Sequence, residues 1–165
     1  MPTAAAKYAQ AKTKMAEAQK QIEQIAADAF KEMTTEFFEG QPDIVSFGWS
    51  QYTPYWNDGD TCTFSANTEY PIVTFKAKDG KIIKYDENNG TLQEANSAVV
   101  EDDIEFSEDD DLEMEPYDDE INKHAKAVSK FLSNFDEDDL ETMFGDHALI
   151  TVTRKKVDTE EYEHE

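Results

Sequence analysis

The first 38 residues constrain the fold more than any other part of this chain. Residues 3–38 contain neither glycine nor proline and are rich in Ala, Lys, Gln and Glu, which lose little conformational freedom on entering a helix. Gly40 and Pro42 follow at the point where such a helix would stop. We therefore predict one long helix over residues 1–38, followed by a single domain over residues 39–165.

Apolar side chains recur along the predicted helix at spacings of three, four and seven residues, which is typical of one apolar face. Residues 22–38 carry most of the large side chains, so this half is predicted to dock on the rest of the domain. Residues 4–18 offer mainly alanines with Tyr8 and Met15. This half is expected either to pack on the same domain or to protrude, where it would fray or pair with another chain.

The central part of the chain is predicted to form an antiparallel sheet of about five strands. Short segments rich in β-branched and aromatic residues lie at residues 44–52, 61–67, 72–77 and 81–85. Asp79-Gly80 has the sequence of a tight hairpin turn between the last two. Two helices, over residues 120–135 and 136–144, precede a final strand over residues 147–157. This order indicates an α+β fold rather than alternating βαβ units.

Charge narrows the classes of partner. The chain has 15 Lys and Arg against 38 Asp and Glu, for a net charge of −23. Direct binding of nucleic acid is disfavoured, because it depends on Lys and Arg that neutralise backbone phosphates. A basic protein partner is favoured, and nucleic-acid-binding proteins are the first class to consider, because complementary potentials speed association. The alternative is that the charge only confers solubility.

The acids predicted to contact such a partner lie in two stretches of the chain. Residues 101–120 are dominated by carboxylates and contain no Lys or Arg, and a further acidic run begins at residue 136. A protein that spaces carboxylates like phosphates would act as a nucleic-acid mimic and inhibit its partner by occupying the basic groove. The candidate contact residues are Asp102, Asp103, Asp109, Asp110, Asp111, Asp118, Asp119, Asp138 and Asp139.

A second candidate site lies in residues 49–64, where aromatic side chains, amides and carboxylates surround a turn. Aromatic rings beside short polar groups are typical of a pocket for a small ligand. The structural alternative is a hairpin core in which Pro54 and Gly59 shape the turn. The candidate ligand-contacting residues are Trp49, Gln51, Tyr52, Tyr55, Trp56, Asn57, Asp58 and Asp60.

The sequence predicts no catalytic residue, cofactor or metal site. When Gly90 is aligned with the glycine of an EF-hand loop, Tyr85 falls where the first acidic ligand is needed. Cys62 is the one cysteine, so neither an internal disulfide nor a site of several thiolates can form, and we interpret it as a structural thiol. No apolar stretch approaches the roughly 18 residues of a membrane span. A reducing cytoplasm is therefore the expected location.

Two segments of the chain carry a resemblance to other proteins. The first includes Trp49-Ser50-Gln51-Tyr52-Thr53-Pro54-Tyr55-Trp56-Asn57-Asp58-Gly59-Asp60, and the second Phe144-Gly145-Asp146-His147 with Thr151-Val152-Thr153-Arg154. They resemble segments of a family of small phage and bacterial proteins. The resemblance implies a folded family, and the host cytoplasm as location if the protein is phage-encoded, and carries over no activity.

Three hypotheses follow from the sequence. The first is a non-enzymatic acidic interaction protein, for example a phage-encoded inhibitor or nucleic-acid mimic, that binds a basic protein. The second is a small-ligand-binding domain or enzyme with a pocket at residues 49–64. The third is an assembly protein that forms a homodimer through its N-terminal helix.

Overall fold

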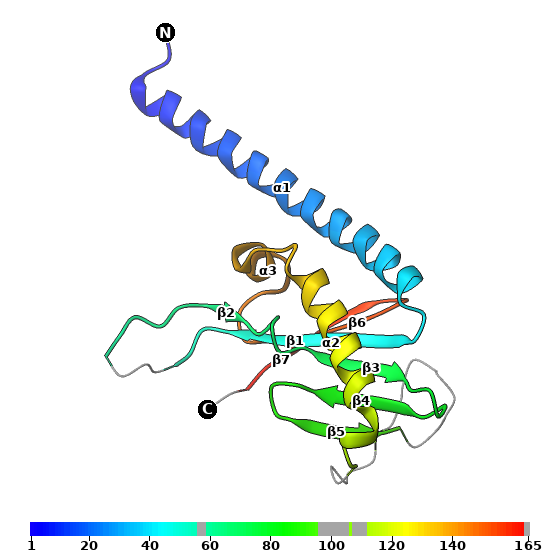
Figure 1. Ribbon diagram of the computed structural model, residues 1–165. Helices are drawn as coiled ribbons and strands as arrows, with labels where there is room; N and C mark the ends of the chain where they lie inside the picture. The colour runs from blue at the N-terminus through cyan, green and yellow to red at the C-terminus, as the bar shows by residue number, and fades with distance from the viewer. Residues whose placement is uncertain (56–58, 96–105, 107–111, 164–165) are drawn as a thin grey trace.

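The structure is a computed structural model that describes residues 1–55, 59–95, 106 and 112–163 (Figure 1). The chain forms a long helix, a sheet and two further helices, so the predicted α+β fold is confirmed. The elements in chain order are α1 (Ala4–Gly40), β1 (Ile44–Tyr52), β2 (Ser65–Ala66), β3 (Ile72–Lys76), β4 (Ile82–Asp86), β5 (Thr91–Glu94), the 3₁₀ turn η1 (Glu115–Tyr117), α2 (Asp118–Leu132), α3 (Glu137–Phe144), β6 (Ala148–Thr153) and β7 (Val157–Glu161).

The sheet is antiparallel and has seven described strands in the order β5-β4-β3-β1-β6-β7, with β2 paired to the end of β1. It is larger than the predicted five strands for two reasons. The short strand β5 was not predicted, and the single strand expected over residues 147–157 is a hairpin of β6 and β7. Its turn contains no glycine or proline, and is closed instead by Thr153, whose hydroxyl accepts hydrogen bonds from the backbone N–H groups of Lys155 and Lys156.

The hairpin predicted at Asp79-Gly80 is confirmed between β3 and β4. Gly80 has a φ of +88°, a conformation that side chains disfavour, and Asp79 Oδ1 accepts a hydrogen bond from Lys81 N at 3.0 Å. The Tyr117 hydroxyl donates to Asp79 Oδ2 at 2.8 Å. The turn is therefore tied to the residues that lead into α2.

Alternate residues of the central strand β1 point toward the helices. Phe47, Trp49 and Gln51 are all fully buried on this face. Phe47 packs against Phe37 of α1 and Phe131 of α2, at ring centroid distances of 5.2 and 5.5 Å. The helices therefore lie on the same face of the sheet, and the core lies between them and β1.

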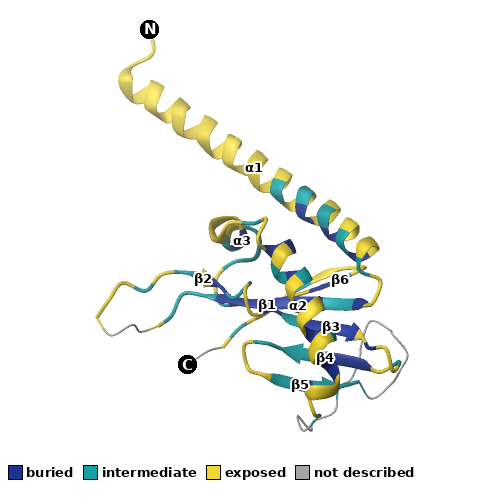
Figure 2. Cartoon of the chain, in the orientation of Figure 1, coloured by how far each residue is buried: buried dark blue, intermediate teal, exposed yellow. Residues whose placement is uncertain are grey.

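Only the last part of α1 docks on this core. Its buried residues are Phe30, Thr34 and Phe38, whereas every residue from 1 to 25 is exposed (Figure 2). The prediction that residues 22–38 dock is therefore wrong for its first part, since Ile22 and Ile25 are 57% and 67% exposed. Figure 1 shows the N-terminal half of α1 extending away from the sheet and the other helices.

Gly48 gives a direct test of the sheet register. It lies in the middle of β1, and a Cβ atom there would collide with the backbone carbonyl oxygen of Ile150 on β6. We expect Gly48→Ala to lower the free energy of unfolding by about 2 kcal/mol or more, because a backbone clash cannot relax locally. Urea unfolding followed by circular dichroism measures the change.

Gly40→Ala is the matched control, because a Cβ at Gly40 at the end of α1 meets nothing within 4 Å. It should leave stability unchanged or raise it by up to about 1 kcal/mol. Equal effects of the two substitutions would contradict the pairing of β1 with β6.

Candidate functional site

The structure divides the predicted ligand pocket of residues 49–64 between the core and the surface. Trp49 and Gln51 are fully buried beneath the helices, Tyr52 is half-buried, and Tyr55 and Asp60 are exposed. Trp56, Asn57 and Asp58 lie outside the described residues. The burial of Trp49 and Gln51 agrees with the structural alternative, in which these side chains belong to the core. Ligand binding by this segment stays a prediction.

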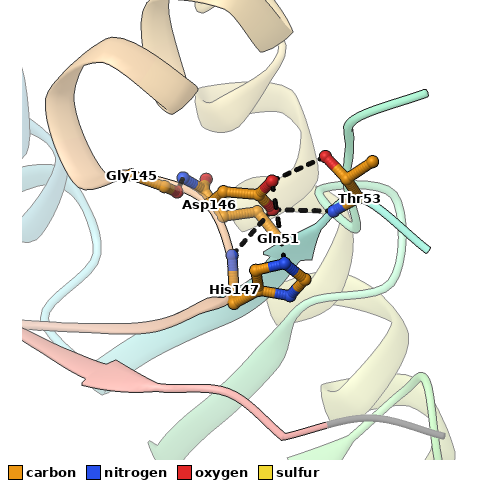
Figure 3. A network of polar contacts seen from close by, with 5 residues as sticks. All are labelled: Gln51, Thr53, Gly145, Asp146 and His147. Atoms are coloured by element: carbon orange, nitrogen blue, oxygen red, sulfur yellow. Dashed lines mark hydrogen bonds and ion pairs between the residues drawn. The ribbon is translucent and has the colours of Figure 1, made fainter. Parts of the chain in front are cut away.

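Gln51 joins β1 to the end of α3. Its side-chain oxygen accepts a hydrogen bond from Trp49 Nε1 at 2.9 Å, and its nitrogen donates to the backbone carbonyls of Leu140 and Gly145 at 3.0 and 2.7 Å. Gln51 and Gly145 appear together in Figure 3. Because α3 ends at Phe144, the carbonyl of its C-cap residue Gly145 has no partner within the helix, and the buried amide supplies one donor to it and a second to Leu140 inside the helix.

Asp146 holds the chain that leaves β1 (Figure 3). Its carboxylate accepts hydrogen bonds from Thr53 N at 2.7 Å, from the Thr53 hydroxyl at 2.6 Å and from His147 N at 2.8 Å. Burial alone would raise the pKa of Asp146, but these hydrogen bonds together hold it below its usual value. The carboxylate is thus stabilised in its charged form, which suits a structural acceptor better than a general base.

Aromatic contacts complete this network. The Tyr55 ring stacks on the His147 ring at 4.9 Å and 12°, and Tyr52 packs on Tyr162 at 5.5 Å. His147 has a φ of +51°, an uncommon backbone conformation that the Asp146 contacts support. The predicted residues Tyr52 and Tyr55 therefore pack the loop after β1 onto the chain flanking β6 and β7.

The described residues contain no group of three or more His, Cys, Asp or Glu placed to hold a metal ion. In the same part of the chain, no helix combines the length and hydrophobicity needed to cross a membrane.

The predicted partner-binding acids that the structure describes lie at two helix N-termini. Asp118 and Asp119 are in the first turn of α2, and Asp138 and Asp139 are in the first turn of α3. Carboxylates at these positions stabilise the helix, because they oppose the positive end of its dipole. All four are exposed. Asp102, Asp103, Asp109, Asp110 and Asp111 lie outside the described residues.

The sheet face turned away from the helices has a hollow of about 410 Å³. Several of the few basic side chains line it, but they are engaged within the chain. Arg154 donates to the carbonyls of Gln41 and Pro42, Lys156 lies 3.3 Å from Asp158, and Lys84 lies 5.2 Å from the ring centroid of Phe106. The Arg154 contacts hold the β6–β7 turn against the end of α1.

The projecting half of α1 carries an unusual concentration of exposed apolar side chains. Tyr8, Met15, Ile22 and Ile25 are 65%, 72%, 57% and 67% exposed. Tyr8, Met15 and Ile22 are seven residues apart, and Ile25 is three further along, so all four lie on one side of the helix. We call these four residues the apolar stripe. The sequence contains their periodicity, but that periodicity does not reveal which part of the helix docks.

Comparisons with protein-family models, with curated proteins and with solved structures find no match to this chain. A functional proposal therefore rests on the residues themselves.

The Gln51 network predicts a large loss of stability on substitution. In Gln51→Leu, Trp49 Nε1 and the carbonyls of Leu140 and Gly145 lose buried partners. We expect the free energy of unfolding to fall by about 2–4 kcal/mol, because each unpaired buried polar group costs about 1–3 kcal/mol. Urea unfolding measures this change. Gln10→Leu, the same substitution at an exposed helical position, should change stability by less than about 0.5 kcal/mol. A similarly small effect at Gln51 would contradict the network.

His124 gives a prediction about pH. It is 3% exposed on α2, its ring lies 4.8 Å from that of Phe75, and no described group bonds its Nδ1. Burial lowers the pKa of His124 below 6.5, Lys123 adds to this effect, and Asp43 and Glu120 oppose it. The unfolded chain therefore takes up a proton near pH 6.5 that the folded chain resists.

The stability that this histidine contributes is thus complete above pH 6.5 and is lost as the pH falls below it. We expect the free energy of unfolding of the unmodified chain, relative to His124→Leu, to decrease between about pH 7.5 and 5.5. Urea unfolding of both chains across this range measures the difference, and the other titrating groups cancel because both chains contain them. A constant difference would contradict a neutral buried His124.

Proposed function

We propose that this chain is an interaction protein that binds other protein chains through the projecting half of α1. The observation that carries the proposal is the apolar stripe, which is exposed on a helix that leaves the body of the protein (Figure 2). Burying a large apolar side chain contributes about 1.5–3 kcal/mol, so the stripe offers a substantial driving force for association.

The helix itself supports this interpretation. Most helices in proteins are stabilised by packing of an apolar face rather than by propensity alone. Residues 4–25 of α1 carry an apolar face, but no such packing covers it in the part of the chain that the structure describes. A partner that covers the stripe would supply this packing. Amphipathic helices that bind in a groove or against another helix are stabilised in the same way.

The α+β body is the anchor of this helix. Phe30 of α1 contacts Phe131 and Phe135 around α2 and Phe144 of α3, with ring centroids 5.1–6.1 Å apart. Arg154 lies 5.1 Å above the ring of Phe38 and donates to the backbone just after the helix. The projecting half therefore leaves the body in a fixed direction.

The acidic surface supports a second candidate function, the binding of a basic protein. Asp118, Asp119, Asp138 and Asp139 are exposed, and in the part of the chain that the structure describes none has a Lys, Arg or His partner within 4 Å. Together with the net charge of −23 this favours basic partners, including nucleic-acid-binding proteins. Inhibition of such a partner by nucleic-acid mimicry stays a prediction.

Site-specific photo-cross-linking in producing cells tests the proposed function. A photoreactive amino acid placed at Met15 or Ile22 faces along the apolar stripe. The matched controls are Glu17 and Gln24, each two residues further on and therefore about 200° around the helix. We expect protein adducts from the stripe positions and far fewer from the control positions, with the adducts identified by mass spectrometry.

Equal yields from both faces, or no adduct from either, would contradict the proposal. Washing the uncross-linked complex in high salt before irradiation tests the acidic candidate, because salt screens exposed charges and leaves apolar contacts intact. Loss of the adducts would favour the acidic surface, and their retention would favour the stripe.

A further inference from the structure

We propose that the chain covering the apolar stripe is a second copy of this protein, with its helix running antiparallel to the first. This inference rests on the proposed function and names the partner of the same surface. The pattern of side-chain sizes, the distribution of charge along the helix and the length of its free part each support it.

The stripe belongs to a heptad pattern over residues 4–29. Apolar residues alternate at spacings of four and three, which is the pattern of positions a and d in a coiled coil. The a positions are Tyr8, Met15, Ile22 and Ala29, and the d positions are Ala4, Ala11, Ala18 and Ile25. A surface with this period fits another helix better than it fits a flat surface.

Side-chain sizes favour the antiparallel orientation. In an antiparallel pair each a position faces a d position of the other helix, and in one register Met15 faces Ala18 and Ile22 faces Ala11 of the second copy. Large side chains then pack against small ones in the four central layers of the seam, which fills space evenly there, while Tyr8 faces Ile25 and Ala4 faces Ala29 in the outer layers. In a parallel pair, Met15 and Ile22 would each face themselves, and Ala11 and Ala18 would do the same, so crowded and underpacked layers would alternate.

Charge favours the same orientation. Residues 4–16 contain three lysines and no acid, whereas residues 17–29 contain three acids and one lysine. In the antiparallel register above, Lys7 flanks the seam opposite Asp28 of the second copy, and the symmetry of the pair makes this contact twice. A parallel pair would instead place Lys7 opposite Lys12 of the second copy, and like charges in these positions repel.

The free length of α1 matches this register. The helix begins at Ala4, residues 4–25 are exposed, and the first buried side chain is Phe30, so the seam is open up to Ala29, which the body half-buries. In the proposed register Ala4 faces Ala29 of the second copy, and each helix ends where the other body begins. The two bodies then lie at opposite ends of a paired segment about 39 Å long.

The buried centre of the docked face of α1 lies to one side of the seam. At 100° per residue, Phe30 and Thr34 lie about 80° and 120° around the helix from Ile22. The body and the second helix therefore contact different sides of α1, and the helix can hold both at once.

Sedimentation equilibrium of the full chain tests the inference. We expect a reversible monomer–dimer equilibrium. Ile22→Lys should raise the dimer dissociation constant at least about a hundredfold, because it removes two buried apolar side chains from the symmetric seam. The control Gln24→Lys, on the opposite side of the helix, should leave the dissociation constant within about twofold.

Charge reversal determines the orientation. Lys7→Glu should weaken an antiparallel dimer about tenfold, since it creates two Glu–Asp contacts, and Lys7→Glu combined with Asp28→Lys should restore it. In a parallel dimer, Lys7→Glu would strengthen association, because it would face Lys12. Strengthening by Lys7→Glu, or failure of the double variant to recover, would overturn the antiparallel arrangement.

A chain that stays monomeric up to concentrations near 1 mM, which corresponds to about 4 kcal/mol of binding free energy, would overturn the inference as a whole. If that monomer still gave stripe-specific adducts with another protein, the proposed function would stand without self-association. If neither a dimer nor stripe-specific adducts were found, both this inference and the proposed function would be contradicted.

Discussion

The packing of the end of α1 against β1 is the contact on which the rest of the structure depends. Phe37 and Phe38 lie 5.2 and 5.6 Å from the ring of Phe47, and Phe30 lies 6.4 Å from that of Trp49. Such aromatic pairs contribute about 0.5–1.5 kcal/mol each beyond the area they bury. Because β1 is also paired with β3 and β6, this contact joins the helix to the centre of the sheet. The direction of the projecting half is set here.

Hydrogen bonds of two polar side chains show how the body is fixed around that contact. The buried Gln51 donates to one carbonyl within α3 and one just after it, and Asp146 at the surface accepts hydrogen bonds from the backbone that leaves β1. Both side chains therefore form hydrogen bonds with other residues of the same chain. The predicted pocket residues Gln51, Tyr52 and Tyr55 thus have structural partners in other segments, whereas the apolar stripe is exposed and the described part of the chain packs no other element against it. This difference is the reason for assigning binding to the helix.

The sequence predicted elements whose signals are local, and it missed contacts between distant residues. The long helix follows from the absence of glycine and proline, and the β3–β4 hairpin follows from Asp79-Gly80. The two carbonyls that Gln51 bonds lie 89 and 94 residues away, so no local pattern could place its side chain in the core. The hairpin of β6 and β7 turns at Thr153, which gives no glycine or proline signal. The periodicity of α1 continues through both halves, and only the fold shows that docking starts at Phe30.

Amide hydrogen exchange of residues 4–25, measured at low and high protein concentration, tests the central claim most directly. An unpaired helical extension opens readily, because it has few tertiary contacts, whereas a paired one is protected. We expect protection of these amides to rise with concentration while that of β1 and β6 stays constant. Equal and low protection of residues 4–25 at both concentrations would contradict the pairing of two copies through this helix, since the helix would then stay unpaired.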